Sequence, residues 1–296
     1  MREFLRRSLH SALSTGPGYE HQPPGAFVDT DRVRGYFIDF RAKTTAASAA
    51  HPSELVPAGL AQLALGWWER HLSGERDAHD SFLGACEALE ARSVREGREL
   101  FWSYDVPVPK YHLVPPWCSA LAQAQIASVF VRASLSTGED RFAAVALGAI
   151  APILPASSSG LLASTADGPA PEEAPTRPAS LILNGWIYAL WGLWDVAVGL
   201  GDDQARALFD ESTACLLRTI GRYDTGWWSR YSLYPHRLTD LAKPFYHRLH
   251  VHQLEMLERL VGNGELGATA RRWASYDTGP RRVGAIAQKA VFAAIG

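Results

Sequence analysis

A tyrosine and three histidines stand at the start of a segment with helical periodicity, AKPFYHRLHVHQLEMLERL at residues 242–260. Leucines recur behind them at helical spacing, which predicts a helix with one buried face. Tyr246, His247 and His250 fall in its first turns. Tyrosine and histidine can move protons when their surroundings shift their pKa values, and the free N–H groups at a helix start favour an anion. The segment therefore suggests acid–base chemistry on an anionic ligand.

The connection in front of this helix is basic and aromatic. Between Trp227 and His252 the chain carries four Lys/Arg and four His against a single acid, Asp240. Tyrosines and tryptophans are frequent in the same region, and aromatic faces pack well on sugar rings. The charge imbalance favours an anionic ligand and the aromatic residues favour a saccharide, whereas the alternative is a solvated basic loop.

Tyr231 and Tyr246 are the candidate acid and base. An unperturbed tyrosine has a pKa of about 10, so a cation must lower it before the phenol works well at neutral pH. Arg230, His247 and His250 are close enough in sequence to supply that charge and to hold a carboxylate. The alternative for each tyrosine is a half-buried aromatic with a hydrogen-bonded hydroxyl. No cysteine pair or HExxH motif accompanies the histidines, so we predict neither a metal nor a cofactor.

A second apolar helix, predicted to begin within the sequence PPWCSALAQAQ, carries polar residues on its surface. Gln123 and Gln125 lie on this helix, and Asn184 lies at the start of the next apolar helix. With Trp117, which precedes the first of these helices, they are candidates for contacting the hydroxyl groups and rings of a saccharide. The alternative is that the amide side chains cap and bridge helices.

An internal repeat organises the chain. Four glycines recur in similar turn sequences at intervals of 64, 63 and 63 residues, at positions 74, 138, 201 and 264. An apolar residue stands seven positions before each glycine: Trp67, Val131, Trp194 and Leu257. In each unit an apolar helix ends at a glycine and an acidic residue begins a more polar one. The repeat therefore predicts stacked helical hairpins with the apolar helices inside.

The repeat also predicts where function lies. If the glycine turns share one rim, the connections 97–117, 156–182 and 222–247 must lie at the opposite rim, where the N-termini of the inner helices converge. Residues 101–107 and 227–235 look like short strands or extended loops, and GYFIDFR at 35–41 alternates as a strand does. We predict an all-α dominated fold, an α/α toroid of about four helical hairpins with a few short β-strands at one rim.

Composition excludes some classes of partner. The 296 residues include 29 Lys/Arg and 31 Asp/Glu, a net charge of -2, so we expect neither nucleic acid nor an anionic membrane as partner. Cys86, Cys118 and Cys215 are an odd number without close pairing, which indicates buried thiols in a reducing compartment.

The longest apolar stretch, LILNGWIYALWGLWDVAVGL, predicts a buried core helix rather than a membrane span, because Asn184 and Asp195 interrupt it. The N-terminus has no apolar run that would make a signal peptide, so we expect a cytoplasmic protein. We divide the chain into an N-terminal extension with a short strand, residues 1–45, and a toroid domain, residues 46–296. A homodimer is left open.

Four segments together resemble the C-terminal catalytic region of the D-glucuronyl C5-epimerases, which convert glucuronate to iduronate. They are PPWCSALAQAQIASVFVRA, EEAPTRPASLILNGWIYALWGLWD, YDTGWWSRYSLYP and LAKPFYHRLHVHQLEML, in family order over roughly residues 100–276. The resemblance implies an α/α toroid, in agreement with the repeat. It also implies proton exchange at C5, next to the carboxylate of an anionic, uronic-acid-containing saccharide.

The resemblance implies roles for particular residues. Tyr231 and Tyr246 stand where the family has functional tyrosines, whereas Ala174 stands where the family has a third. Because alanine cannot move a proton, one alternative is that Tyr231 and Tyr246 suffice for an epimerase, alone or with Glu172, Glu173 or Tyr104 covering the lost group. The alternatives are a uronate lyase, since β-elimination begins with the same proton abstraction, and a protein that binds a glycan or carboxylate without catalysis.

Overall fold

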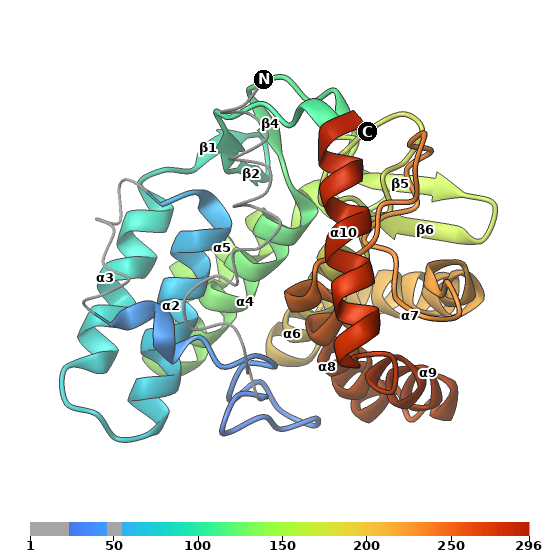
Figure 1. Ribbon diagram of the computed structural model, residues 1–296. Coiled ribbons are helices and arrows are strands. Elements are labelled where there is room, and N and C mark those ends of the chain that lie inside the picture. The colour runs from blue at the N-terminus through green and yellow to red at the C-terminus, as the bar shows by residue number, and fades with distance from the viewer. Residues whose placement is uncertain (1–23, 46–54, 296) are drawn as a thin grey trace.

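The computed structural model describes residues 24–45 and 55–295, and α-helices dominate this part of the chain (Figure 1). Eight of its helices form four hairpins: α2 (Pro57–Leu72) with α3 (Ala78–Glu90), α4 (Ala120–Thr137) with α5 (Asp140–Ile150), α6 (Leu183–Leu200) with α7 (Asp203–Thr219), and α8 (Pro244–Val261) with α9 (Gly264–Ala274). Helix α10 (Gly279–Ile295) follows. The predicted all-α dominated fold is confirmed.

The apolar helix of each hairpin lies on the inside. Successive inner helices pack against each other in the order α2, α4, α6, α8. Helices α4 and α6 form the centre: every residue from 120 to 133 and from 183 to 196 is buried. They approach so closely that a Cβ at Gly192 would lie 2.5 Å from the Ala124 carbonyl oxygen, so only glycine fits there.

Glycines in the left-handed conformation end three of the inner helices, two of them at positions that the repeat predicts. Gly138, Gly201 and Gly262 are the C-caps of α4, α6 and α8, with φ of 73°, 68° and 65°. In the fourth unit the prediction of Gly264 was wrong, because Gly264 is the first residue of α9. The spacing pointed to Gly264, but Gly262 directly follows the last residue of α8 and is the C-cap.

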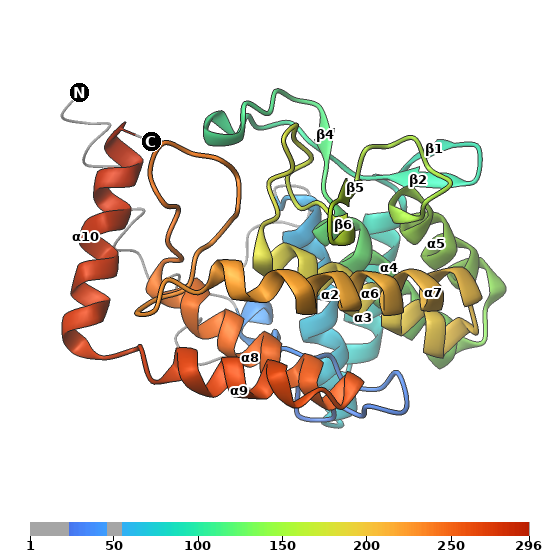
Figure 2. The ribbon, with the colours of Figure 1, turned by 90° about the vertical axis from the view of Figure 1, so that its right-hand side faces the viewer.

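Short strand pairs lie at one end of the helices, and Figures 1 and 2 both draw them along the same edge of the molecule. Each pair is antiparallel: β1 (Val94–Glu96) with β2 (Glu99–Phe101), β3 (Ser103–Tyr104) with β4 (Trp117–Cys118), and β5 (Leu162–Thr165) with β6 (Gly168–Pro171). The connections also contain the 3-10 helices η4 (Pro109–Tyr111), η5 (Ala151–Ile153) and η6 (Ile220–Tyr223). Residues 227–235 are an extended loop, which was one of the two predicted forms.

The segment 35–41 is not the predicted strand: it has no strand pairing, and the 3-10 helix η1 (Arg41–Thr44) begins at its end. Its alternating aromatic residues are instead buried between the inner helices. The Phe37 ring stacks on Trp191 of α6 with centroids 4.7 Å apart, and Tyr36 meets the same indole edge-on at 6.0 Å. These aromatic rings therefore belong to the same core as the helices.

A buried ion pair fixes this segment in place. Arg132 of α4 and Asp195 of α6 are completely buried and 2.5 Å apart. The Arg132 guanidinium also donates to the Gly35 carbonyl oxygen at 3.0 Å, and Glu69 of α2 accepts the Tyr36 N–H at 2.6 Å. Three inner helices thus share one polar network around the backbone of the N-terminal segment.

The start of α8 is anchored by the histidine that follows Tyr246. The His247 ring stacks on Trp228 at 3.8 Å, its Nε2–H donates to the Trp273 carbonyl oxygen at 3.0 Å, and its Nδ1 lies 2.8 Å from the Ser229 hydroxyl. Burial lowers the pKa of His247 to about 4, so the imidazole is neutral. These contacts determine where α8 presents Tyr246.

Helix α10 lies beside the connection 222–243 at one side of the molecule (Figure 2). Of the helices in residues 24–45 and 55–295, none combines the length and the apolar character that a membrane crossing needs.

We expect Asp195→Ala to lower the free energy of unfolding by about 3–5 kcal/mol, because it leaves the buried Arg132 guanidinium without its counter-ion. Chemical denaturation measures this. Arg206→Ala, which breaks the exposed Arg206–Asp210 pair on α7, is the control and should change it by less than about 1 kcal/mol. Equal effects of the two substitutions would contradict the role assigned to the network.

The neutral His247 predicts acid sensitivity. Its pKa in the folded state, about 4, lies below the ordinary 6.5. Between pH 6.5 and pH 4, His247 therefore binds a proton in the unfolded chain but not in the folded one. The contribution of neutral His247 to the free energy of unfolding is fully present above pH 6.5 and is lost as the pH falls toward 4. In urea unfolding at both pH values, His247→Gln should lose about 3 kcal/mol less than the wild type on acidification. Equal losses would show that His247 does not titrate in this way.

Candidate active site

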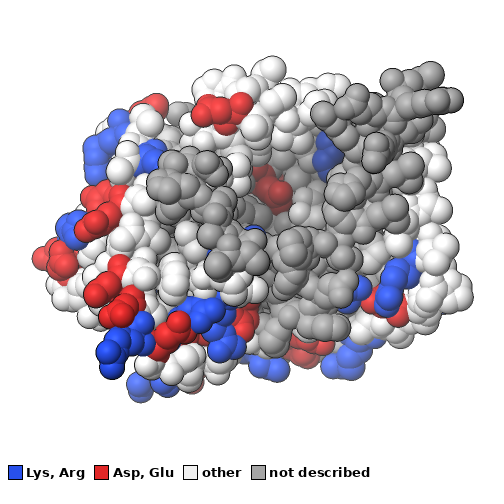
Figure 3. Space-filling view, turned by 60° about the vertical axis from the view of Figure 1, so that its left-hand side comes forward, with Lys and Arg blue, Asp and Glu red and all other residues white. Residues whose placement is uncertain are grey.

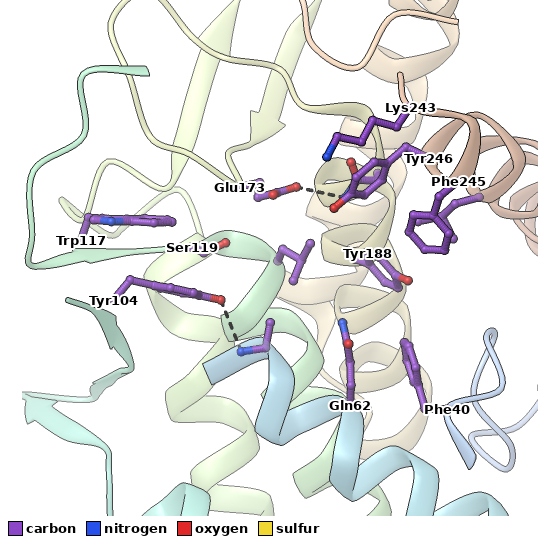
Figure 4. A pocket seen from close by; sticks show the side chains of 14 residues that line it. Phe40, Gln62, Tyr104, Trp117, Ser119, Glu173, Tyr188, Lys243, Phe245 and Tyr246 are labelled. Carbon is purple, nitrogen blue, oxygen red and sulfur yellow. Dashed lines mark hydrogen bonds between the residues drawn. The ribbon is translucent and has the colours of Figure 1, made fainter. Parts of the chain in front are cut away.

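A cavity of ≈ 420 Å³ lies where the first turns of the four inner helices meet (Figure 4). Ala58 of α2, Leu121 of α4, Asn184 of α6 and Tyr246 of α8 all line it. The connections contribute the remaining polar wall: Tyr104 and Trp117, Glu173, and Lys243. The prediction that inner helix N-termini and the long connections meet at one rim is thereby confirmed, and it places N–H groups around the cavity.

One wall of the cavity is a stacked aromatic pair. Strands β3 and β4 place Tyr104 opposite Trp117, and their rings stack at 4.5 Å with an interplanar angle of 12°. The Trp117 indole N–H donates to the Val106 carbonyl oxygen at 2.8 Å, and the Tyr104 hydroxyl accepts the Ala58 N–H at 3.3 Å. Both rings are therefore held rigidly and present a flat face of the kind that packs on a sugar ring.

Glu173 is the carboxyl group in the cavity wall. It accepts a hydrogen bond from Asn184 Nδ2 at 3.1 Å and one from the Tyr231 hydroxyl at 3.4 Å. Burial raises the pKa of Glu173 to about 7, and the positive charge of Lys110 opposes this rise. A carboxyl group with that pKa can both take and give a proton near neutral pH.

The two predicted tyrosines lie together. The Tyr231 and Tyr246 rings meet edge-on with centroids 4.8 Å apart. Tyr246 lines the cavity, whereas Tyr231 lies behind it and is 9% exposed. Burial and the nearby Glu173 carboxylate raise the pKa of Tyr246 to about 12, and the same causes raise that of Tyr231 well above its ordinary value. Both phenols are therefore protonated at neutral pH, contrary to the cation-lowered pKa that the sequence suggested.

Ala174 occupies the expected place beside these tyrosines. It packs in one small cluster with Tyr111, Tyr231 and Ala242, and Tyr246 borders that cluster. A buried alanine therefore lies beside Tyr231, next to the other groups of the candidate site.

The cations near the cavity are lysines and not the predicted residues. Lys243, the N-cap of α8, lines the cavity, and Lys110 Nζ lies 4.5 Å from the Tyr231 ring centroid. His247 and His250 are completely buried and contact Ser229 and Trp273, and neither lines the cavity. Burial lowers the pKa of both imidazoles, so neither carries charge at neutral pH.

Arg230 also lies outside the cavity lining. Its backbone N–H donates to the Tyr223 carbonyl oxygen at 2.8 Å, and it pairs with Leu241 as an isolated bridge. The predicted basic patch therefore separates into buried neutral histidines, an arginine outside the cavity lining, and one lysine, Lys243, in the cavity wall.

Three further predicted binding residues are structural. Gln123 accepts the Trp102 N–H and donates to the Leu100 and Ala149 carbonyl oxygens, and Gln125 accepts from Gln62. Glu172 accepts from the Ser180 N–H and hydroxyl and from the Leu181 N–H. Each of the three is buried and bridges segments of the backbone or helices, which was the stated alternative for the glutamines.

Sequence reasoning missed part of the lining. Ser119, which directly precedes α4, lines the cavity, and its Oγ has no hydrogen-bond partner among the described residues. The same holds for Asn184 Oδ1. Phe40, Gln62 and Tyr188 complete the lower part in the view of Figure 4. The signal for Ser119 was its position directly before an apolar helix, which marks a rim residue under the repeat.

Charges on the face drawn in Figure 3 alternate in sign around a hollow that holds an acidic side chain. No broad field of one sign covers the described part of this face. Attraction of an anion must therefore come from local groups, as the net charge suggests.

Comparison with known proteins agrees with this geometry. Residues 96–275 match the family model described as D-glucuronyl C5-epimerase C-terminus. The chain is 29% identical over 223 residues to D-glucuronyl C5-epimerase of Caenorhabditis elegans, covering 70% of this chain and 36% of that protein. An uncharacterised protein of Methanocaldococcus jannaschii is 30% identical over 166 residues, 53% of this chain and 51% of that protein.

The chain thus spans about a third to a half of the length of these curated relatives. The match to the family model covers most of the chain, including the residues of the cavity wall from Tyr104 to Tyr246. The resemblance stated from the four sequence segments is confirmed. This chain belongs to the D-glucuronyl C5-epimerase family, as a member matching its C-terminal region.

Proposed function

We propose that this chain exchanges the C5 proton of a glucuronyl residue in an anionic, uronic-acid-containing saccharide, interconverting glucuronate and iduronate. The observation that carries the proposal is the presence of two proton carriers, Glu173 and Tyr246, in the wall of one cavity with the Lys243 cation. Membership of the epimerase family supports the reaction class. Epimerisation at C5 needs a base on one face of the sugar and an acid on the other.

In the proposed reaction the Glu173 carboxylate removes the C5 proton and Tyr246 returns one to the opposite face. The Tyr231 hydroxyl, hydrogen-bonded to Glu173, stabilises the carboxylate before the transfer. In the reverse direction the Tyr246 phenolate removes the C5 proton and protonated Glu173 returns one, and forming the phenolate is the harder step because the pKa of Tyr246 is about 12. Proton removal places negative charge on the adjacent uronate carboxylate, which Lys243 and the helix N–H groups stabilise.

The remaining polar and aromatic wall would orient the saccharide. The Tyr104–Trp117 pair offers a flat face to a sugar ring, and the unpartnered Ser119 Oγ and Asn184 Oδ1 are hydrogen-bonding groups for its hydroxyls. Orientation matters for rate, because proton transfer requires the C5–H bond to point at the base.

Glu173 is the group that we propose to compensate for Ala174. Its pKa of about 7 lets it accept a proton at neutral pH without a third phenol. Glu172, which is buried against the 180–181 backbone, and Tyr104, whose hydroxyl accepts the Ala58 N–H, are engaged elsewhere.

Glucuronyl oligosaccharides incubated with the protein in heavy water should gain deuterium at C5, detected by mass spectrometry and NMR. Tyr246→Phe and Glu173→Gln should each lower the rate at which the inverted, deuterium-bearing uronate forms by roughly 10²–10⁴-fold, because inversion needs a proton carrier on both faces of C5. The wild-type rate should rise as pH increases through about 7, where Glu173 becomes the carboxylate. Tyr276→Phe and Glu265→Gln, remote from the cavity lining, are the matched controls.

Other outcomes of this experiment identify the alternatives. Formation of an unsaturated uronate, which absorbs in the ultraviolet, would show that the chain is a lyase, because the same carbanion would have expelled its 4-linked group. Binding of the oligosaccharide with no label at C5 would replace catalysis with recognition. Unchanged inversion at C5 in Tyr246→Phe and Glu173→Gln would contradict the assigned proton carriers.

Trp117→Ala should weaken the affinity for a glucuronyl disaccharide roughly tenfold or more, since it removes the aromatic face that packs on the ring. Trp117→Phe retains a flat ring and should recover most of the affinity. Isothermal titration calorimetry measures both. Unchanged affinity in Trp117→Ala would mean that the saccharide does not contact this wall.

A further inference from the structure

A cluster of three charged side chains lies behind Tyr231, of which Asp240 and Lys289 are buried and Lys110 is partly exposed. Asp240, 3% exposed, accepts hydrogen bonds from Lys289 on Oδ1 and from Lys110 on Oδ2, the latter at 3.4 Å. The Ser232 and Tyr111 hydroxyls also donate to Oδ2, at 3.2 and 3.4 Å. Two ammonium groups sharing one carboxylate leave the cluster with a net positive charge.

Both ammonium groups approach the ring of Tyr231. Lys110 Nζ lies 4.5 Å and Lys289 Nζ 5.3 Å from the ring centroid, within the range of cation–π attraction. The Asp240 carbonyl oxygen accepts the Tyr231 N–H at 2.7 Å, so the residue that gathers the cations also holds the backbone of Tyr231. Since the Tyr231 hydroxyl donates to Glu173, the cluster connects to the cavity wall through a single side chain.

Lys289 belongs to α10, which lies beyond the residues 96–275 that match the family model. It is 8% exposed, and one turn further on Phe292, 4% exposed, packs edge-on against the His236 ring at 4.9 Å. The helix is therefore docked against the connection 222–243 by buried side chains, with an apolar anchor next to the cation (Figure 2).

We propose that Lys289 is a positioning residue of the candidate active site, which by sharing Asp240 with Lys110 keeps net positive charge behind Tyr231 and so favours the ionised form of Glu173. The catalytic consequence rests on the proposed function, whereas the effect on Glu173 does not. Helix α10 is then a part of the site, although it lies outside the matched region.

Lys110 is the charged group that acts on both Lys289 and Glu173. Burial lowers the pKa of Lys289 to about 8, with Lys110 also lowering it and Asp240 opposing the fall. Burial lowers the pKa of His236, so this imidazole adds no charge at neutral pH. The groups that act on Lys289 are Asp240, Lys110 and Lys243, and those that act on Glu173 are Lys110, Tyr231, Asn184 and Glu172.

The test is the titration of Glu173 itself, followed by NMR of ¹³C-labelled glutamate carboxyl groups and assigned by the signal lost in Glu173→Gln. Lys289→Met removes one positive charge and should raise the Glu173 midpoint by roughly half to one pH unit, the size expected for a charge separated from it by one side chain. Lys289→Arg should keep the wild-type midpoint. Arg281→Met, which removes an exposed charge from the same helix, should leave it unmoved.

Substitutions of Asp240 give the opposite sign. Asp240→Asn removes a negative charge from the cluster and should lower the Glu173 midpoint, by less than Lys289→Met raises it because Asp240 also helps to keep Lys289 protonated. The double variant Asp240→Asn with Lys289→Met keeps one positive charge, as in the wild-type cluster, and should restore the wild-type midpoint. A structural role alone would not produce this rescue. If Lys289→Met does not fold, Lys289→Gln removes the same charge and makes the same test.

An unmoved Glu173 midpoint in folded Lys289→Met, or no fall in Asp240→Asn, would overturn the inference. Because the titration needs no substrate, lack of C5 exchange in the wild type would defeat the proposed function and leave this test intact. Where the wild type exchanges, Lys289→Met should slow exchange roughly three- to tenfold below the Glu173 midpoint and recover above it. An equal loss at all pH values would point to packing instead.

Discussion

The direction of the inner helices is the constraint on which the site depends. Because each hairpin returns the chain to the same end, α2, α4, α6 and α8 all begin at one rim and bring their first turns to one cavity. Two features hold that arrangement together. Helix α4 packs closely on α6, which requires Gly192, and Arg132 ties these helices to the N-terminal segment. The connections that cross the rim need little regular structure, since the helix starts already place them.

Burial and charge oppose each other at this rim, and the balance differs from one group to the next. Burial dominates at Glu173, whose pKa rises to about 7, and at both tyrosines, which stay protonated. Charge dominates at Asp240, where two lysines keep the pKa of the carboxyl below its ordinary value despite burial. The carboxyl that can change its proton near neutral pH thus faces the cavity, while the permanently ionised one lies behind it.

Local patterns in the sequence predicted the architecture, whereas the direction in which individual side chains point depended on tertiary packing. The apolar residues and glycine turns of the repeat recur at fixed spacing, so the hairpins, the rim and the nearness of Tyr231 to Tyr246 followed from them. His247 and His250 were misplaced because sequence proximity to Tyr246 does not reveal that the helix turns them toward Trp273. Lys289 had no local signal, since it reaches Asp240 only when α10 folds back across the chain.

The most direct measurement is a crystal structure of the protein with a glucuronyl disaccharide bound. The account predicts the uronate ring in the cavity, with its carboxylate toward Lys243 and with Glu173 and Tyr246 on opposite faces of C5, each at roughly the 3–3.5 Å of a reactive contact. A disaccharide bound with both groups on the same face of C5, or bound elsewhere with the cavity empty, would contradict it.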